Sequence, residues 1–231
     1  MKKIWVFLFF FLIVLSNASA QFSQSIRIKS GEDIYEKLAR EIYLYPSFIK
    51  GTVFFKSEKA NHASLNYNLL HGKMLFIHPM GDTLSIADED SIKFIQILQD
   101  TFFFNKDYLQ LIKGNNIVKL ALKQVITVVD QEKIGGYGQP VPGGAVSSLD
   151  VLSTESQTFR LDIRRDLILD KRVTFYLGDS QNRFLPANKK NLLGIFPDRR
   201  KELINYLDKM DTNFNNVQDL IRLLNFMKML K

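Results

Sequence analysis

Apolar and polar side chains alternate along much of the chain with a period of two, starting near residue 51. The clearest case is 63–68, where Ala63, Leu65 and Tyr67 are each followed by a polar residue. This alternation places one face of a strand against a core and the other toward water. Because such stretches follow one another through short turns, we predict a mainly β (α+β) fold. Its antiparallel β-meander should form a curved sheet or a barrel.

The same pattern gives the extent of the individual strands. They are predicted at 51–55, 63–68, 73–78, 83–87, 92–98, 101–105, 108–112, 117–129, 159–163, 173–177 and 183–186. The stretch 73–78 is apolar on both faces, so we expect it to be a central strand.

Helical periodicity occurs at both ends of this β-rich region. Ile34, Leu38 and Ile42 are four residues apart and predict a short N-terminal helix with one apolar stripe. Near the C-terminus, Pro197 suits the first turn of one helix, and the pattern over 217–230 predicts another. We expect these two C-terminal helices to pack on the sheet.

The first twenty residues have the organisation of a secretory signal peptide. Two lysines precede an apolar run over 4–15, and Ala18-Ser19-Ala20 has the small-residue pattern that signal peptidases cut. A membrane anchor is the weaker alternative, because the run is short of the roughly 20 apolar residues that span a bilayer. We predict export to the periplasm or the medium, with a possible peripheral location at the outer membrane. No transmembrane segment is expected after signal removal.

The mature chain, 21–231, is predicted to be a single domain. It comprises the N-terminal helix and meander (21–130), a Gly/Pro-rich loop (131–157), and basic strands with the C-terminal helices (158–231). The chain has no cysteine, which excludes disulfides and acylation on a cysteine. Its stability must therefore come from its core.

Charge is distributed unevenly along the mature chain. Residues 21–155 carry 14 Lys and Arg against 15 Asp and Glu, whereas 156–231 carry 15 against 9. For an exported protein, the excess of positive charge in 156–231 favours an anionic lipid or glycan over nucleic acid as a partner. The alternative is a solvated basic surface that binds no partner. The candidate contact residues are Arg164, Arg165, Lys189, Lys190, Arg199, Arg200 and Lys201.

The residues that most often carry chemistry form no recognisable motif here. His62, His71 and His78 lack metal-binding spacing, and no G-x-S-x-G elbow is present. We therefore predict no catalytic residue, no metal and no cofactor. The glycine-rich segment 135–144 lacks the Lys-Ser/Thr of a phosphate-binding loop. It is either a plain connection or a flap that presents Tyr137 to a ligand or partner.

Several stretches together carry a resemblance to other proteins. They are Tyr43-Leu44-Tyr45-Pro46, Leu65-Asn66-Tyr67-Asn68-Leu69-Leu70, Gly72-Lys73-Met74-Leu75-Phe76-Ile77, Gly81-Asp82-Thr83-Leu84, Gly135-Gly136-Tyr137-Gly138 and Phe196-Pro197 with the helices around it. Over most of 43–230 the chain resembles a group of uncharacterised exported β-rich proteins of Gram-negative bacteria. The resemblance implies export and a β-rich fold, and it implies no catalytic residue.

These observations favour a non-enzymatic, exported cell-envelope protein that binds an amphiphilic or anionic envelope ligand or a protein partner. Its aromatic residues are suited to lining an apolar concavity, as in most ligand pockets. Two alternatives stay open. One is an interaction module of a larger exported assembly that makes contact through 131–157. The other is a hydrolase whose site is dispersed along the chain.

Overall fold

The computed structural model describes residues 23–29, 34–131, 133–134, 140–141 and 167–230. The predicted signal peptide, the predicted strand at 159–163, and the candidate contacts Tyr137, Arg164 and Arg165 lie outside these residues.

The main element is an antiparallel sheet of eleven strands. Along its path the strands are β1 (Ser23–Ile28), β12 (Leu167–Asp179), β9 (Val118–Gln131), β8 (Asp107–Gly114), β7 (Asp100–Asn105), β6 (Ile92–Ile97), β2 (Ile49–Phe55), β3 (Ala60–Asn68), β4 (Lys73–Ile77) and β5 (Thr83–Ser85). The eleventh strand, β13 (Phe184–Pro186), pairs with β12. A separate two-stranded ladder joins β10 (Lys133–Ile134) to β11 (Pro140–Val141), and a 3-10 turn, η1 (Glu89–Ser91), precedes β6.

The predicted mainly β, antiparallel fold is confirmed, and the sheet is curved rather than closed into a barrel. Two meanders leave β2 in opposite directions, because β3 pairs with one side of β2 and β6 with the other. The prediction that 73–78 is central is wrong, since β4 lies one strand from the edge of the sheet. Its apolar residues Phe76 and Ile77 line an open groove, which explains the misleading pattern.

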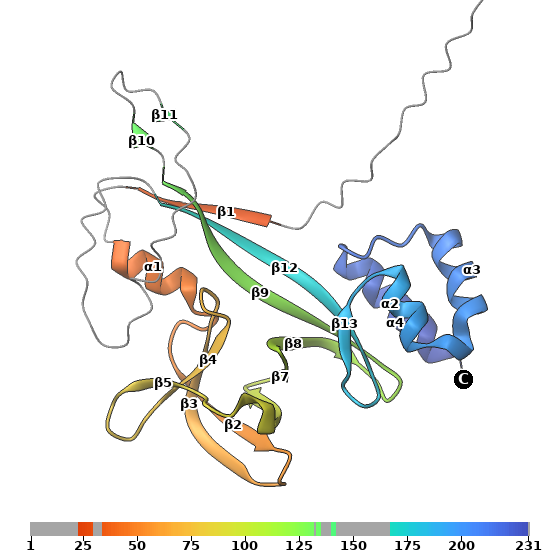
Figure 1. Cartoon of the computed structure of the whole chain (residues 1–231), viewed down its shortest axis with the longest axis horizontal. Helices are drawn as coiled ribbons and strands as arrows, with labels where there is room; N and C mark the ends of the chain where they lie inside the picture. The colour runs from red at the N-terminus through yellow and green to blue at the C-terminus, as the bar shows by residue number, and fades with distance from the viewer. Residues whose placement is uncertain (1–22, 30–33, 132, 135–139, 142–166, 231) are drawn as a thin grey trace, which may run out of the picture.

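The sheet curls so far that the end of β3 returns to β9 (Figure 1). The amide of Ile126 donates to the carbonyl oxygen of Leu69 at 2.9 Å, and the Tyr67 hydroxyl donates to the carbonyl oxygen of Gln124 at 3.2 Å. The curl encloses a first core in which Tyr67 packs near Phe102 and Tyr108, with ring centroids 6.1 Å apart in each pair.

Four α-helices complete the described chain. They are α1 (Ile34–Ile42), α2 (Lys189–Ile195), α3 (Arg200–Met210), which follows the 3-10 turn η3 (Pro197–Arg199), and α4 (Val217–Met229). The predicted N-terminal helix and both predicted C-terminal helices are present. The additional helix α2 begins where the Asn188 side chain accepts a hydrogen bond from the amide of Asn191 at 2.8 Å, a typical N-cap.

The three C-terminal helices cover a second core at the far end of the sheet (Figure 1). Buried leucines of the helices pack with Val118 and Leu120 of β9 and Leu177 of β12. Because β9 also supplies Ile126 to the first core, one continuous sheet carries both cores.

Gly51 in β2 is required by the close approach of its neighbours. A Cβ at this position would lie 2.7 Å from the carbonyl oxygen of Gln96 in β6 and 2.9 Å from Leu65 Cδ1. We expect Gly51→Ala to lower the free energy of unfolding by about 2 kcal/mol in urea denaturation, because the two strands must separate.

Gly194 in α2 provides the matched control. A Cβ at Gly194 meets nothing within 4 Å. Gly194→Ala should therefore raise the free energy of unfolding by about 0.5–1 kcal/mol through its higher helix propensity. Equal effects of the two substitutions would contradict the close packing at Gly51.

Candidate functional site

A groove lies between the first half of β3 and the hairpin formed by β4 and β5. Its volume is about 820 Å³. Its walls are mostly apolar and include Val53, Phe55, Leu65, Phe76, Leu84 and Ile86. Val53 and Leu65 are buried and belong to the first core, whereas the other four are half-buried. The groove is thus a continuation of the first core that opens to the surface.

The groove exists because β3 and β4 diverge. β4 pairs with β3 only over Leu65–Asn68 and then turns into β5. The turn is held by the amide of His78, which donates to the carbonyl oxygen of Asp82 at 2.7 Å. Gly81 lies within it at a φ of 98°, which glycine tolerates at little cost. Within the described chain, no strand pairs with 60–64 of β3 on the side that faces the groove.

Polar groups are confined to part of the groove lining. Asn61 and His62 come from β3, and Ser85 and Asp88 come from β5 and the segment after it. His62 Nδ1 lies 2.9 Å from the hydroxyl of Thr52 on the outer face of the β2–β3 pair. An apolar cavity with a few polar groups suits a ligand that is itself mostly apolar.

A shallower hollow of about 440 Å³ lies on the outer face of the same two strands. Lys50, Thr52, His62 and Ser64 alternate along the strands and line it. His62 and Ala63 line both the hollow and the groove, so the two concavities lie on opposite sides of β3.

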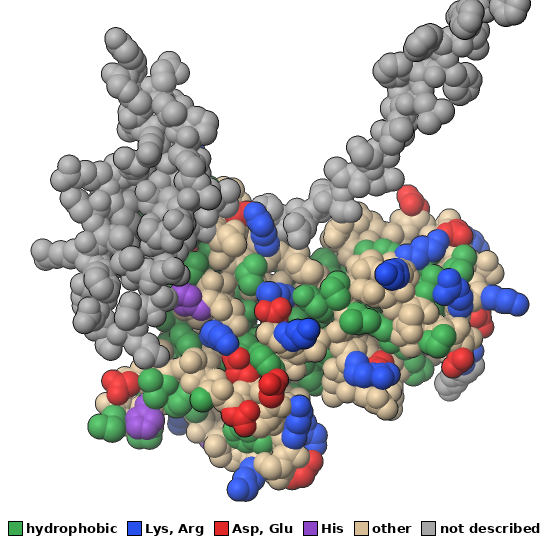
Figure 2. Space-filling model, in the orientation of Figure 1, with side chains coloured by type: hydrophobic (Ala, Val, Ile, Leu, Met, Phe, Trp, Pro, Cys, Tyr) green, Lys and Arg blue, Asp and Glu red, His purple; other side chains and the backbone are tan. Residues whose placement is uncertain are grey.

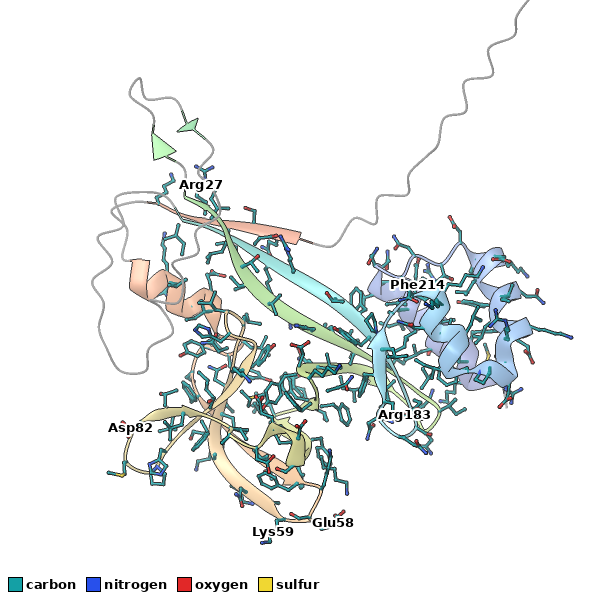
Figure 3. The ribbon with its side chains drawn as sticks, in the orientation of Figure 1. Arg27, Glu58, Lys59, Asp82, Arg183 and Phe214 are labelled. Atoms are coloured by element: carbon teal, nitrogen blue, oxygen red, sulfur yellow. The ribbon has the colours of Figure 1, made fainter. Side chains whose placement is uncertain are left out.

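The tip of the β4–β5 hairpin exposes an apolar side chain beside the groove. Met80 is 83 % exposed, next to His78 and Asp82. Figure 2 shows hydrophobic, histidine and acidic side chains together at this tip, and Figure 3 labels Asp82 there. An exposed methionine beside an apolar groove is suited to contact an apolar partner.

A buried polar pair joins β8 to the 3-10 turn η1. Tyr108 Oη and Glu89 Oε1 are both buried and make no hydrogen bond within the described chain, whereas Glu89 Oε2 accepts from Lys73 Nζ at 2.7 Å. Burial and the nearby Glu89 carboxylate raise the pKa of Tyr108, so its phenol stays neutral.

We expect Tyr108→Phe to raise the free energy of unfolding by about 1 kcal/mol, because the buried hydroxyl faces the Glu89 carboxylate without a hydrogen bond of good geometry. Urea denaturation at neutral pH measures this. A loss of more than about 1 kcal/mol would instead show that the hydroxyl makes a stabilising hydrogen bond.

The structure gathers the described candidate cations on α2 and at the start of α3. Lys189, Lys190, Arg200 and Lys201 are exposed. Lys189 pairs with Asp208 of α3 at 2.9 Å, so acidic residues accompany these cations.

Arg199 is the fifth candidate contact residue that the structure describes. Its Nη1 lies 3.9 Å from Oε1 of Glu202. Blue and red side chains are accordingly mixed over the helical part in Figure 2. Figure 1 shows that part at the opposite end of the sheet from β3, β4 and β5, which border the groove. Contact of these cations with anionic lipid or glycan stays a prediction.

The histidines are separated in the structure. His62 borders the groove, His71 is exposed in the β3–β4 turn and His78 lies in the β4–β5 turn. In the described ranges, no three His, Cys, Asp or Glu residues are arranged to hold a metal ion. None of the helices in those ranges has both the length and the apolar character needed to cross a membrane.

A scan against protein-family models, a search of curated proteins and a search of solved structures each found no match to this chain. The resemblance to exported β-rich proteins therefore stays a prediction.

Proposed function

We propose that this chain is an exported, non-enzymatic binding protein of the cell envelope. The groove beside β3 would hold the apolar part of its ligand or protein partner. The observation that supports this most is an open, mostly apolar cavity of about 820 Å³ continuous with the core. Ligand pockets typically measure about 300–1,000 Å³ and combine apolar walls with a few polar groups.

The groove supports binding better than hydrolysis. Thr52 and His62 form a hydroxyl–imidazole pair at its rim, but both are on the outer face of the strands. In the described chain no carboxylate hydrogen-bonds to His62, so a third group that would orient the imidazole is lacking there. The arrangement therefore favours a site that holds a ligand without transforming it.

Binding of the neutral apolar dye N-phenyl-1-naphthylamine to the mature chain tests this function. The dye fluoresces when it leaves water for an apolar site. We expect one saturable class of sites, from which dodecanoate displaces the dye. A fluorescence signal that does not saturate, or that dodecanoate leaves unchanged, would argue against a ligand groove.

A further inference from the structure

Over 60–64, the groove-facing side of β3 is a sheet edge with which no strand of the described chain pairs. The amide of Phe55 donates to the carbonyl oxygen of Lys59 at 2.9 Å. This hydrogen bond shows which residues of β3 direct their backbone N–H and C=O groups toward β2. In an antiparallel ladder, the residues that bond to one neighbour alternate with those that face the other side. The backbone N–H and C=O of Asn61 therefore point toward β2, as those of Lys59 do. The backbone N–H and C=O of Ala60 and His62 point to the other side, toward the groove.

The pairing of β3 with β4 shows the same alternation of backbone groups. It also shows where the pairing on this side of β3 ends. β4 covers the groove-facing side of β3 only as far back as Leu65, opposite Phe76. Continuing the same register would place Pro79 opposite His62. Proline has no N–H to donate to the carbonyl oxygen of His62, and the chain turns toward β5 at this point instead.

This edge lacks the features that usually protect an exposed strand. Edges are commonly blocked by proline, by a bulge or by charged side chains along the strand. The segment Ala60-Asn61-His62-Ala63 contains no proline, lysine or acidic residue, and its pairing with β2 is regular. All four of its residues also line the apolar groove. An available edge and an apolar cavity thus lie side by side.

We propose that the groove receives an extended segment of a partner protein, which pairs with the free edge of β3 and places alternate apolar side chains in the groove. This inference rests on the proposed function, because it uses the same groove. A strand added in this way pairs its backbone with Ala60 and His62, and every second side chain faces Phe76, Leu84 and Ile86. A hydrocarbon chain laid along the same edge would cover these backbone groups without pairing them, which is unfavourable.

Two modified peptides test the pairing directly. The probe is a capped, fluorescein-labelled nonapeptide in which Thr and Val alternate. Two further copies carry N-methyl groups on alternate amides. One copy has the odd-numbered amides methylated and the other the even-numbered amides, so each copy has one of its two edges blocked. We expect the unmodified peptide to bind and to compete with N-phenyl-1-naphthylamine. One methylated copy should bind about tenfold more weakly, because it loses hydrogen bonds to β3, and the other should bind nearly as well as the unmodified peptide.

Substitutions at His62 test the protein side of the same contact. His62→Pro removes an N–H that faces the groove and not β2, a position where an edge strand tolerates proline. His62→Ala removes the same side chain and keeps the N–H. We expect His62→Pro to weaken peptide binding about tenfold and His62→Ala to change it less than threefold. Circular dichroism and a thermal melt check that both variants fold, and the methylated peptides provide the test if His62→Pro does not.

The outcomes separate this inference from the proposed function. Saturable binding of the dye with no binding of the nonapeptide would overturn the peptide inference and leave the groove as a small-ligand site. Absence of both would overturn both proposals. Equal binding of the two methylated copies would also overturn strand pairing. A dimer of the chain that His62→Pro dissociates would assign the edge to a second copy and overturn the inference.

Discussion

Replacing Ala63 with tryptophan is expected to weaken the binding of apolar ligands at least about a hundredfold, because the indole occupies the groove. Ala63 is half-buried on the inner face of β3 and lines the groove. It pairs with Gly51, where Leu65 and Ile97 already fill the space that a cross-strand side chain would take. A tryptophan there has the groove as its nearest free volume.

The measurement is the dissociation constant of N-phenyl-1-naphthylamine for the variant and for the unmodified chain. Thr52→Trp is the matched control, since it adds the same ring to the outer face of the same pair of strands. We expect Thr52→Trp to change the constant less than about threefold. If Ala63→Trp binds the dye as tightly as the unmodified chain does, the dye site is elsewhere.

Replacing Asn66 with alanine is expected to lower the free energy of unfolding by about 3 kcal/mol, the largest loss we predict for a single side chain. Asn66 is 1 % exposed. Its Oδ1 accepts from the amide of Tyr45 at 3.1 Å, and its Nδ2 donates to the carbonyl oxygens of Tyr45 at 2.8 Å and Ser47 at 3.2 Å. The substitution leaves these buried backbone groups of Tyr45 and Ser47 without partners. The segment after α1 then stays attached to β3 through the amide of Leu44, which donates to the carbonyl oxygen of Tyr67 at 3.0 Å.

Asn61→Ala is the control for this second prediction. Asn61 is on the same strand but is exposed, so its loss should change the free energy of unfolding by less than about 0.5 kcal/mol. Urea denaturation followed by circular dichroism measures both variants. A loss below about 1 kcal/mol for Asn66→Ala would mean that the segment at Tyr45 is held by other contacts.

The sequence predicts the individual strands well, because alternation is a local signal. The stretch 63–68 lies within β3, and 92–98 and 101–105 match β6 and β7 closely. Strand order is not visible in the same pattern. β6 pairs with the edge of β2 that β3 leaves free. No local residue preference in β6 or β2 specifies this partner.

Two short elements, β1 and α2, are not predicted by the sequence pattern. β1 lies outside the predicted strands, and its place in the sheet depends on pairing with β12, far away in the chain. The helix α2 is too brief for a clear period, although Asn188 is a recognisable cap and Leu192 and Leu193 are its buried residues.

The groove was the least predictable feature. Leu84 and Ile86 have the alternation of an ordinary half-buried strand, and nothing local distinguishes a residue that faces a core from one that faces an open groove. Clusters of cations are directly visible in a sequence, so the sequence predicts a contact surface at the cations between 189 and 201. One local signal for the groove exists, because Pro79 cannot continue a ladder and so marks where β4 leaves β3.

We propose that the cavity between β3 and the β4–β5 hairpin holds apolar ligands. Nuclear Overhauser effects between dodecanoate and residues 21–231, with ¹³C-labelled isoleucine and leucine methyl groups, test this. We predict contacts from the acyl protons to the methyl groups of Ile77, Leu84 and Ile86. Contacts confined to leucines of the helical core, such as Leu220 and Leu224, would contradict it.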